Sequence, residues 1–147
     1  MIKFVYQNQP KGTGDAILKC EKYIKDKYFL MLLPDDLIIK KNCTIEMIKL
    51  HAKKKCSIIA TKTVNKKTVS RWGILSIKNK NKNNFQITDV IEKPSISEAR
   101  SNYAIIGRYI LPKNIMREIK KLKPGAGNEI HITDAIKSLI YKKEPFY

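Results

Sequence analysis

Two adjacent carboxylates follow an apolar run near the start of this 147-residue chain. Asp35 and Asp36 come directly after Leu33 and Pro34, in a sequence that contains few acidic residues. A carboxylate in this position can hold Mg²⁺ through a hard oxygen contact, while its neighbour caps the next turn. The alternative is that both aspartates are ordinary turn residues.

A second pair of charged residues, Glu92 and Lys93, ends another apolar run just before Pro94. A carboxylate can accept hydrogen bonds from sugar hydroxyls, and a lysine can meet a phosphate as a point charge. Gly73, which follows Arg71 and Trp72, permits the close approach of a ring-shaped ligand. Taken alone, a Glu-Lys pair is more often a solvated strand end, so this alternative stays open.

The loop over residues 7–15 contains Gln7, Gly12 and Gly14 and precedes a helical pattern. Its glycines allow the backbone to approach a ligand closely, and the amino end of a helix favours an anion. Because G-x-G also occurs often by chance, a tight strand-to-helix turn is the competing interpretation.

The formal net charge of +17 raises the question of nucleic-acid binding. Nearly all the basic residues are lysines scattered along the chain, as an AT-rich genome would produce, and a phosphate-rich small ligand would benefit from the same field. We therefore expect no specific nucleic-acid partner.

Three widely spaced cysteines and two isolated histidines indicate neither a disulfide framework nor a zinc site. No signal peptide or membrane span is recognisable, so we expect a cytoplasmic protein without a membrane partner.

Apolar periodicity and breaker residues predict strands that alternate with helices. Strands are expected over residues 2–6, 29–33, 57–63 and 103–111, with a hairpin of 73–77 and 85–91 around the polar turn 78–84. Helices are expected after Gly14 with Asp15 as its cap, around residues 45–52 with Asn42 or Thr44 as cap, through Met116 and Ile119, and from Thr133.

This order predicts an α/β fold with a mainly parallel, Rossmann-like sheet and a mixed, antiparallel hairpin region. The run over residues 29–33 is expected to be buried on both faces of that sheet. We expect one domain over residues 1–147, because no linker or repeat divides the chain. Open α/β sheets bind ligands beyond the carboxyl ends of their strands, where the charged junctions lie.

The ordered series of motifs resembles the sugar nucleotidyltransferases, and among them the bacterial UTP–glucose-1-phosphate uridylyltransferases. The matching segments are a Q-x-x-P-x-G-x-G loop from Gln7, L-P-D-D at residues 33–36, an R-(aromatic)-G turn, E-K-P at 92–94, S-N-x-A-I-x-G-R-Y at 101–109 and P-G-A-G-x-E-I-x-x-T-D-A-I at 124–136. The resemblance covers essentially the whole chain.

The resemblance implies a role for each matched residue. Gln7, Gly12 and Gly14 would bind the nucleotide, and Asp35 would bind Mg²⁺ beside the phosphates. Gly73 and Glu92 would contact glucose, and Lys93 the phosphate of glucose-1-phosphate. The implied partners are therefore UTP and glucose-1-phosphate, which would react to UDP-glucose and pyrophosphate.

The sequence also departs from the pattern that it resembles. Asp15 and Thr13 stand where the family usually has histidine and leucine, which places an extra carboxylate near an anionic ligand. The family's amino-terminal arginine-bearing glycine loop and its second metal-binding aspartate have no counterpart, so the implied fold is incomplete at both ends. We expect exposed sheet edges and apolar surface where the first strand would lie.

Three interpretations follow from these departures. The chain is a truncated uridylyltransferase with impaired activity, one subunit of a split enzyme, or a non-catalytic binding protein for sugar phosphate or nucleic acid. A homo-oligomer or a complementing subunit would fit the first two.

Overall fold

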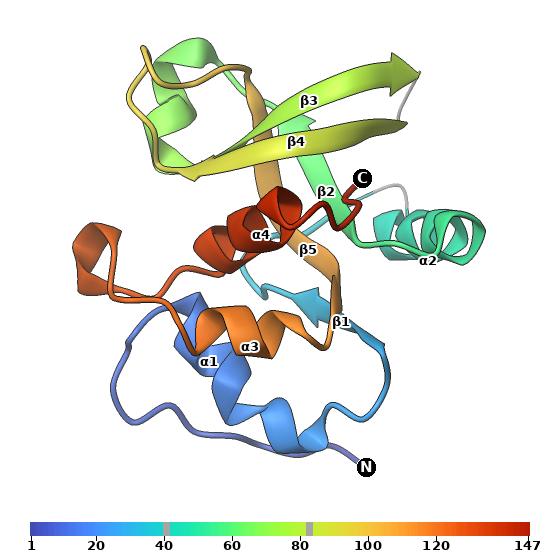
Figure 1. The fold of residues 1–147 in the computed structure, drawn as a ribbon, viewed down its shortest axis with the longest axis vertical. Helices are drawn as coiled ribbons and strands as arrows, with labels where there is room; N and C mark the ends of the chain where they lie inside the picture. Colours follow the sequence, from blue (N-terminus) through green and yellow to red (C-terminus); the bar gives the residue numbers. More distant parts are fainter. Residues whose placement is uncertain (40–41, 82–83) are drawn as a thin grey trace.

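The computed structural model describes residues 1–39, 42–81 and 84–147 as a sheet flanked by helices (Figure 1). The strands are β1 (Tyr28–Leu32), β2 (Ile58–Thr63), β3 (Gly73–Asn81), β4 (Asn84–Glu92) and β5 (Tyr103–Pro112). The α-helices are α1 (Thr13–Lys19), α2 (Cys43–Lys54), α3 (Ile115–Ile119) and α4 (Ile132–Tyr141). Short 3-10 segments are η1 (Glu21–Tyr23), η2 (Lys66–Arg71) and η3 (Ala126–Asn128).

Strand β5 organises the sheet, because β1 pairs with one of its edges and β2 with the other. Tyr109 of β5 lies opposite Met31 of β1 and also opposite Ile59 of β2. The two outer strands therefore run in the same direction as each other, and β5 runs against both. The hairpin β3–β4 joins β5 through Ile74 and Leu75 of β3.

The prediction of a mainly parallel sheet is wrong for the described residues, since every pairing between named strands is antiparallel. The physical reason lies in the crossover through α2. It joins two strands of like direction, as a βαβ unit does, but a strand from much later in the chain occupies the space between them. The α/β class itself is confirmed.

Both faces of the central strand are covered, as side-chain alternation along a strand requires. Tyr109 and Leu111 face a large apolar cluster that includes Ile136 of α4. Ile110, between them in sequence, packs on the opposite face with Met47 of α2. The helices α3 and α4 thus cover one face of β5, and α2 covers the other (Figure 1).

Two predictions for the first third of the chain are wrong. Residues 2–6 form no strand, and Ile2, Phe4 and Tyr6 are all more than four-fifths exposed. A strand needs a neighbour to satisfy its backbone hydrogen bonds, and the described residues offer this segment none. β1 is not buried on both faces either, because Leu30 and Leu32, which share one face of the strand, are 40% and 48% exposed.

The local predictions elsewhere fare better. The Asn42 side chain accepts the N–H of Ile45 and caps α2, as predicted. The hairpin forms, and its strands extend into the polar segment; residues 82–83 of the predicted turn lie outside the described residues. Asp15 is not a helix cap, because Gly12 occupies that position and Asp15 lies inside the first turn of α1.

The last residues of the chain fill a gap between β2 and β4. The Ile59 N–H donates to the Tyr147 carbonyl at 2.7 Å, and the Ile87 N–H donates to the Phe146 carbonyl at 2.9 Å. Phe146 is fully buried and forms a parallel bridge with Ser57. The carboxyl terminus therefore ties two strands that do not otherwise pair.

Candidate functional site

A cleft of about 330 Å³ brings together four of the predicted site residues. Asp35, Gly73, Glu92 and Lys93 all line it, although they follow or begin three different strands. The sequence placed each of them at a strand end, and the sheet topology places these ends side by side.

The hairpin positions Gly73, Glu92 and Lys93, the predicted sugar-binding residues. Gly73 begins β3 and lies opposite Glu92 at the end of β4. One residue further, the Lys93 N–H donates to the Trp72 carbonyl at 3.0 Å. Lys93 has φ of 44°, in the left-handed region, so the chain turns sharply as it leaves the strand.

Glu92 is held from the opposite side by the first turn of α4. The hydroxyl of Thr133 donates to Glu92 Oε2 at 2.9 Å. A Cβ atom at Gly73 would lie 3.1 Å from Thr133 Cγ2 and 3.2 Å from Glu92 Oε2. The absence of a side chain at Gly73 therefore leaves room for the carboxylate and the threonine to meet.

The two aspartates have separate structural roles. Asp36 Oδ2 accepts the N–H of Gly107 at 2.8 Å, and the Asp36 carbonyl accepts Arg108 Nη2 at 2.7 Å. Asp35 is exposed, lines the cleft and has no hydrogen bond or ion pair within the described part of the chain. Asp36 thus fixes the loop to β5, and Asp35 keeps its carboxylate available.

Tyr109 forms part of the wall of the cleft. Burial raises the pKa of its phenol well above the ordinary value, and the nearby carboxylates of Glu92, Asp36 and Asp35 raise the pKa further. The phenol is therefore neutral at physiological pH and contributes no negative charge to a cleft that already holds several carboxylates.

The loop with the predicted nucleotide-binding residues packs against the segment before α4. The Gly14 N–H donates to the Ile130 carbonyl at 2.8 Å. Gly12, at φ of 94°, passes so close that a Cβ atom there would lie 2.6 Å from the same carbonyl oxygen. These glycines therefore have a packing role here, and their contact with a nucleotide stays a prediction.

Gln7 is bound inside this loop. Its Nε2 donates to Asp15 Oδ2 at 2.7 Å and to the Gly12 carbonyl at 3.1 Å. Lys19 lies 3.6 Å from Asp15 Oδ1 and balances part of its charge. The carboxylate that the sequence pattern singled out thus engages the amide nitrogen of the predicted base-binding residue.

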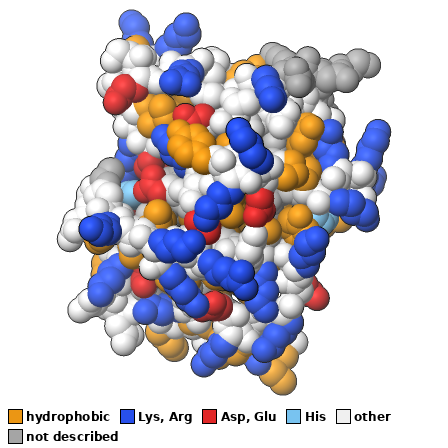
Figure 2. All heavy atoms as spheres, in the orientation of Figure 1, with side chains coloured by type: hydrophobic (Ala, Val, Ile, Leu, Met, Phe, Trp, Pro, Cys, Tyr) orange, Lys and Arg blue, Asp and Glu red, His pale blue; other side chains and the backbone are white. Residues whose placement is uncertain are grey.

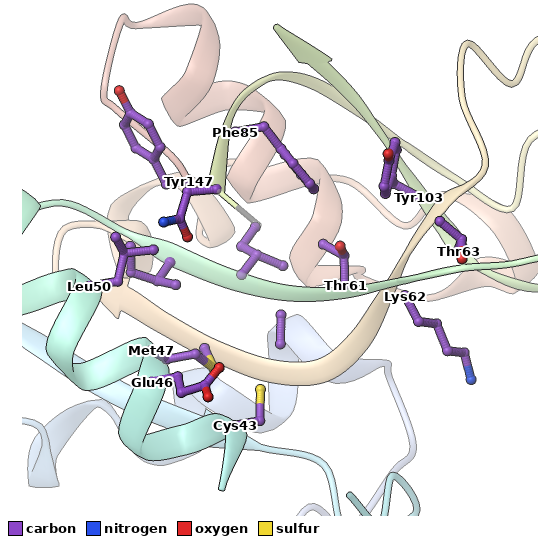
Figure 3. Close-up of a pocket in the computed structure, with 14 residues that line it drawn as sticks. Cys43, Glu46, Met47, Leu50, Thr61, Lys62, Thr63, Phe85, Tyr103 and Tyr147 are labelled. Carbon is purple, nitrogen blue, oxygen red and sulfur yellow. The ribbon is translucent and has the colours of Figure 1, made fainter. Parts of the chain in front are cut away.

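A larger cavity, of about 530 Å³, lies elsewhere, between α2, β2 and the tip of the hairpin (Figure 3). The side chains of Met47 and Leu50 approach it from α2, and those of Phe85 and Tyr103 from the far side. It contains none of the predicted site residues, so we place the functional site in the smaller cleft.

The charge distribution fits the sequence-based interpretation of scattered lysines. Figure 2 shows basic side chains distributed over the whole displayed face, with acidic and apolar side chains between them. In the described ranges no cluster of three or more His, Cys, Asp or Glu side chains could hold a metal ion. No described helix is long and apolar enough to span a bilayer.

Sequence reasoning gave Thr133 as the start of the last helix and as part of a motif, and assigned it no role in the site. Its contact with Glu92 bridges 41 positions in sequence and depends on how α4 docks against the hairpin. The motif over residues 124–136 was the signal that pointed to this region.

Comparisons with known proteins show relatives that match nearly the whole chain. A UTP–glucose-1-phosphate uridylyltransferase of Pseudomonas aeruginosa is 38% identical over 138 residues, which cover 92% of this chain and 50% of that protein. One of Bacillus subtilis is 32% identical over 147 residues, covering 99% of this chain and 49% of that protein. The chain thus spans about half the length of the curated relatives that it matches.

Solved structures show the same relationship. The crystal structure of a UDP-glucose pyrophosphorylase complexed with UDP-glucose has a TM-score of 0.92 and 38% identity, covering 99% of this chain and 56% of that one. The UDP-glucose pyrophosphorylase of Acinetobacter baumannii has a TM-score of 0.77 and 28% identity, covering 97% and 50%. The sequence model described as nucleotidyl transferase matches residues 1–147, and this chain belongs to the nucleotidyl transferase family.

Proposed function

We propose that this chain carries the sugar-phosphate side of a UTP–glucose-1-phosphate uridylyltransferase site. The observation that supports the proposal is the convergence of Asp35, Gly73, Glu92 and Lys93 on one cleft. In the proposed reaction, a phosphate oxygen of glucose-1-phosphate attacks the α-phosphorus of UTP. The bond from that phosphorus to the bridging oxygen of pyrophosphate breaks, and UDP-glucose forms.

The side chains of the cleft fit the two parts of a sugar phosphate. Glu92 can accept hydrogen bonds from glucose hydroxyls, and Gly73 lines the same cleft without a side chain that would obstruct a sugar ring. Lys93 would neutralise the phosphate of glucose-1-phosphate, which lowers the cost of bringing two anions together. Catalysis in this proposal rests on alignment and charge neutralisation, without a covalent enzyme intermediate.

Mg²⁺ is the proposed cofactor, and Asp35 is the residue that would hold it. Mg²⁺ is often bound through one or two carboxylates, with phosphate oxygens and water as the remaining ligands. The described residues fit this mode, because Asp35 is uncommitted while Asp36 is engaged by Gly107. The bound ion would neutralise charge on the phosphates.

We further propose that the 147-residue chain alone turns over slowly or not at all, although it retains UDP-glucose binding. The nucleotide side gives the reason: Gln7 is engaged by Asp15, and residues 2–6 have no strand partner among the described residues. The exposed apolar side chains of Ile2, Phe4 and Leu37 favour association with another chain or a second copy. The cytoplasmic location and the single-domain boundary stay predictions.

The test is UDP-glucose formation from UTP, glucose-1-phosphate and Mg²⁺, run beside direct UDP-glucose binding. For the wild-type chain we expect measurable UDP-glucose binding and little turnover. Asp35→Ala should weaken Mg²⁺-dependent UTP binding. Asp26→Ala, which removes an exposed carboxylate elsewhere, serves as the control. Ready turnover that Asp35→Ala abolishes would overturn the low-activity proposal. A folded chain that binds no UDP-glucose would overturn the proposed function itself.

A further inference from the structure

The contact between Thr133 and Glu92 carries an inference that rests on the proposed function and concerns the sugar side of the same cleft. Glu92 has two carboxylate oxygens, and the Thr133 hydroxyl occupies Oε2 at 2.9 Å. We infer that Thr133 is a positioning residue: its hydroxyl orients the Glu92 carboxylate so that Oε1 presents its lone pairs to a sugar hydroxyl.

Burial makes this orientation specific. Thr133 is only 4% exposed, so water cannot readily replace its hydroxyl as the donor to Glu92. Glu92 is only partly buried and, within the described residues, Thr133 is its one hydrogen-bonding side chain. A carboxylate without this donor would rotate among several orientations, and binding a hydroxyl would then cost the entropy of fixing one of them.

The backbone around Thr133 is fixed from the opposite side of the cleft. The N–H of Ile132, the preceding residue, donates to Thr13 Oγ1 at 3.1 Å, and the Ile130 N–H donates to the Lys11 carbonyl at 2.8 Å. The start of α4 is thus anchored to the first residue of α1 and to the loop before it, and from there Thr133 reaches the hairpin. Thr133 links the proposed nucleotide side of the cleft to its proposed sugar side.

The inference predicts that Thr133 affects the sugar and not the nucleotide. The experiment measures dissociation constants for UDP-glucose and for UDP by calorimetry, on the wild-type chain and on Thr133→Val and Thr133→Ser. Valine keeps the shape and removes the donor, so we expect UDP-glucose to bind about tenfold more weakly while UDP binds as before. Serine restores the donor and should bind UDP-glucose within about threefold of wild type.

A matched substitution, Thr63→Val on the exposed end of β2, should leave both constants unchanged. The inference is overturned if Thr133→Val binds UDP-glucose as wild type does, if UDP binding falls in parallel, or if serine fails to rescue. These outcomes differ from failure of the proposed function, in which the wild-type chain binds no UDP-glucose at all.

Discussion

The two sides of the cleft are built to different degrees. On the proposed sugar side, Gly73, Glu92 and Lys93 lie on or directly after a paired hairpin, and Thr133 of α4 donates a hydrogen bond to the Glu92 carboxylate. On the proposed nucleotide side, the loop over residues 7–15 packs on the segment before α4, and the residues that lead into it are exposed coil. The comparison teaches that a residue of the right type at the right spacing forms a site only where neighbouring elements fix its backbone.

The largest effect is expected for Gly107 of β5, whose N–H binds Asp36 in the loop after β1. An alanine Cβ there would collide with Leu33 Cβ and approach Asp36 Oδ2 at 3.0 Å. We expect Gly107→Ala to lower the free energy of unfolding by about 3 kcal/mol or to prevent folding. Gly125→Ala is the matched control, because its Cβ would meet nothing closer than 3.5 Å. Equal stabilities by denaturant titration would show that the loop is not tightly fixed.

A mutation of intermediate expected effect concerns Glu118, which joins α3 to α4. Hydrogen bonds from Lys142 and Ser138 of the α4 region, opposed by partial burial, lower the pKa of Glu118 to about 2. A carboxyl whose pKa is depressed on folding stabilises above its unfolded pKa, near 4.3, and this stabilisation is lost as pH falls toward 2.

We therefore expect Glu118→Gln to lower stability by roughly 1–2 kcal/mol at pH 7, less than the whole shift implies because the lysine partners are half exposed. The difference from wild type should shrink between pH 4.5 and 2. Glu98→Gln, at an exposed carboxylate whose pKa is lowered by Ser95, is the control and should cost much less. A pH-independent difference in thermal melts would contradict the assignment.

The smallest expected effect tests whether the nucleotide side is weakened by one charge. Asp15→Asn keeps an oxygen that can accept from Gln7 Nε2 but removes the carboxylate charge near an anionic ligand. We expect UDP to bind about threefold more tightly, because a like-charge repulsion near the protein surface is worth under ~1 kcal/mol. Asp26→Asn removes the same charge from an exposed position outside the cleft and should leave the constant unchanged. Unaltered UDP affinity in Asp15→Asn would show that Lys19 already neutralises the carboxylate.

Local sequence signals predicted what depends on neighbours along the chain. Asn42 caps its helix, the hairpin forms from the two predicted apolar runs, and Glu92 ends a strand. These features rest on side-chain capping and alternation, which a short stretch of sequence contains.

Features that depend on residues far apart in the chain could not be predicted from the sequence. Residues 2–6 have strand composition, but composition cannot show whether a neighbouring strand is present. The direction of β5 is set by its pairing with β1 and β2, between residues 40 to 84 positions apart. The choice of Asp36 over Asp35 as the acceptor for the Gly107 N–H depends on a contact across 71 positions. For the same reason, the partner of Glu92 came from docking of α4 and not from any local pattern.

The position of Phe146 has a consequence for synthesis on the ribosome. The side chain of Phe146 is fully buried in the main apolar cluster. The backbone carbonyls of Phe146 and Tyr147 accept hydrogen bonds from β4 and β2, respectively. While the exit tunnel still encloses residue 146, the space between β2 and β4 stays unfilled, and the apolar side chains around it are exposed to water. Until residues 146 and 147 have left the tunnel, β2 and β4 lack the contacts that join them, and their exposed edges favour aggregation of the emerging chain.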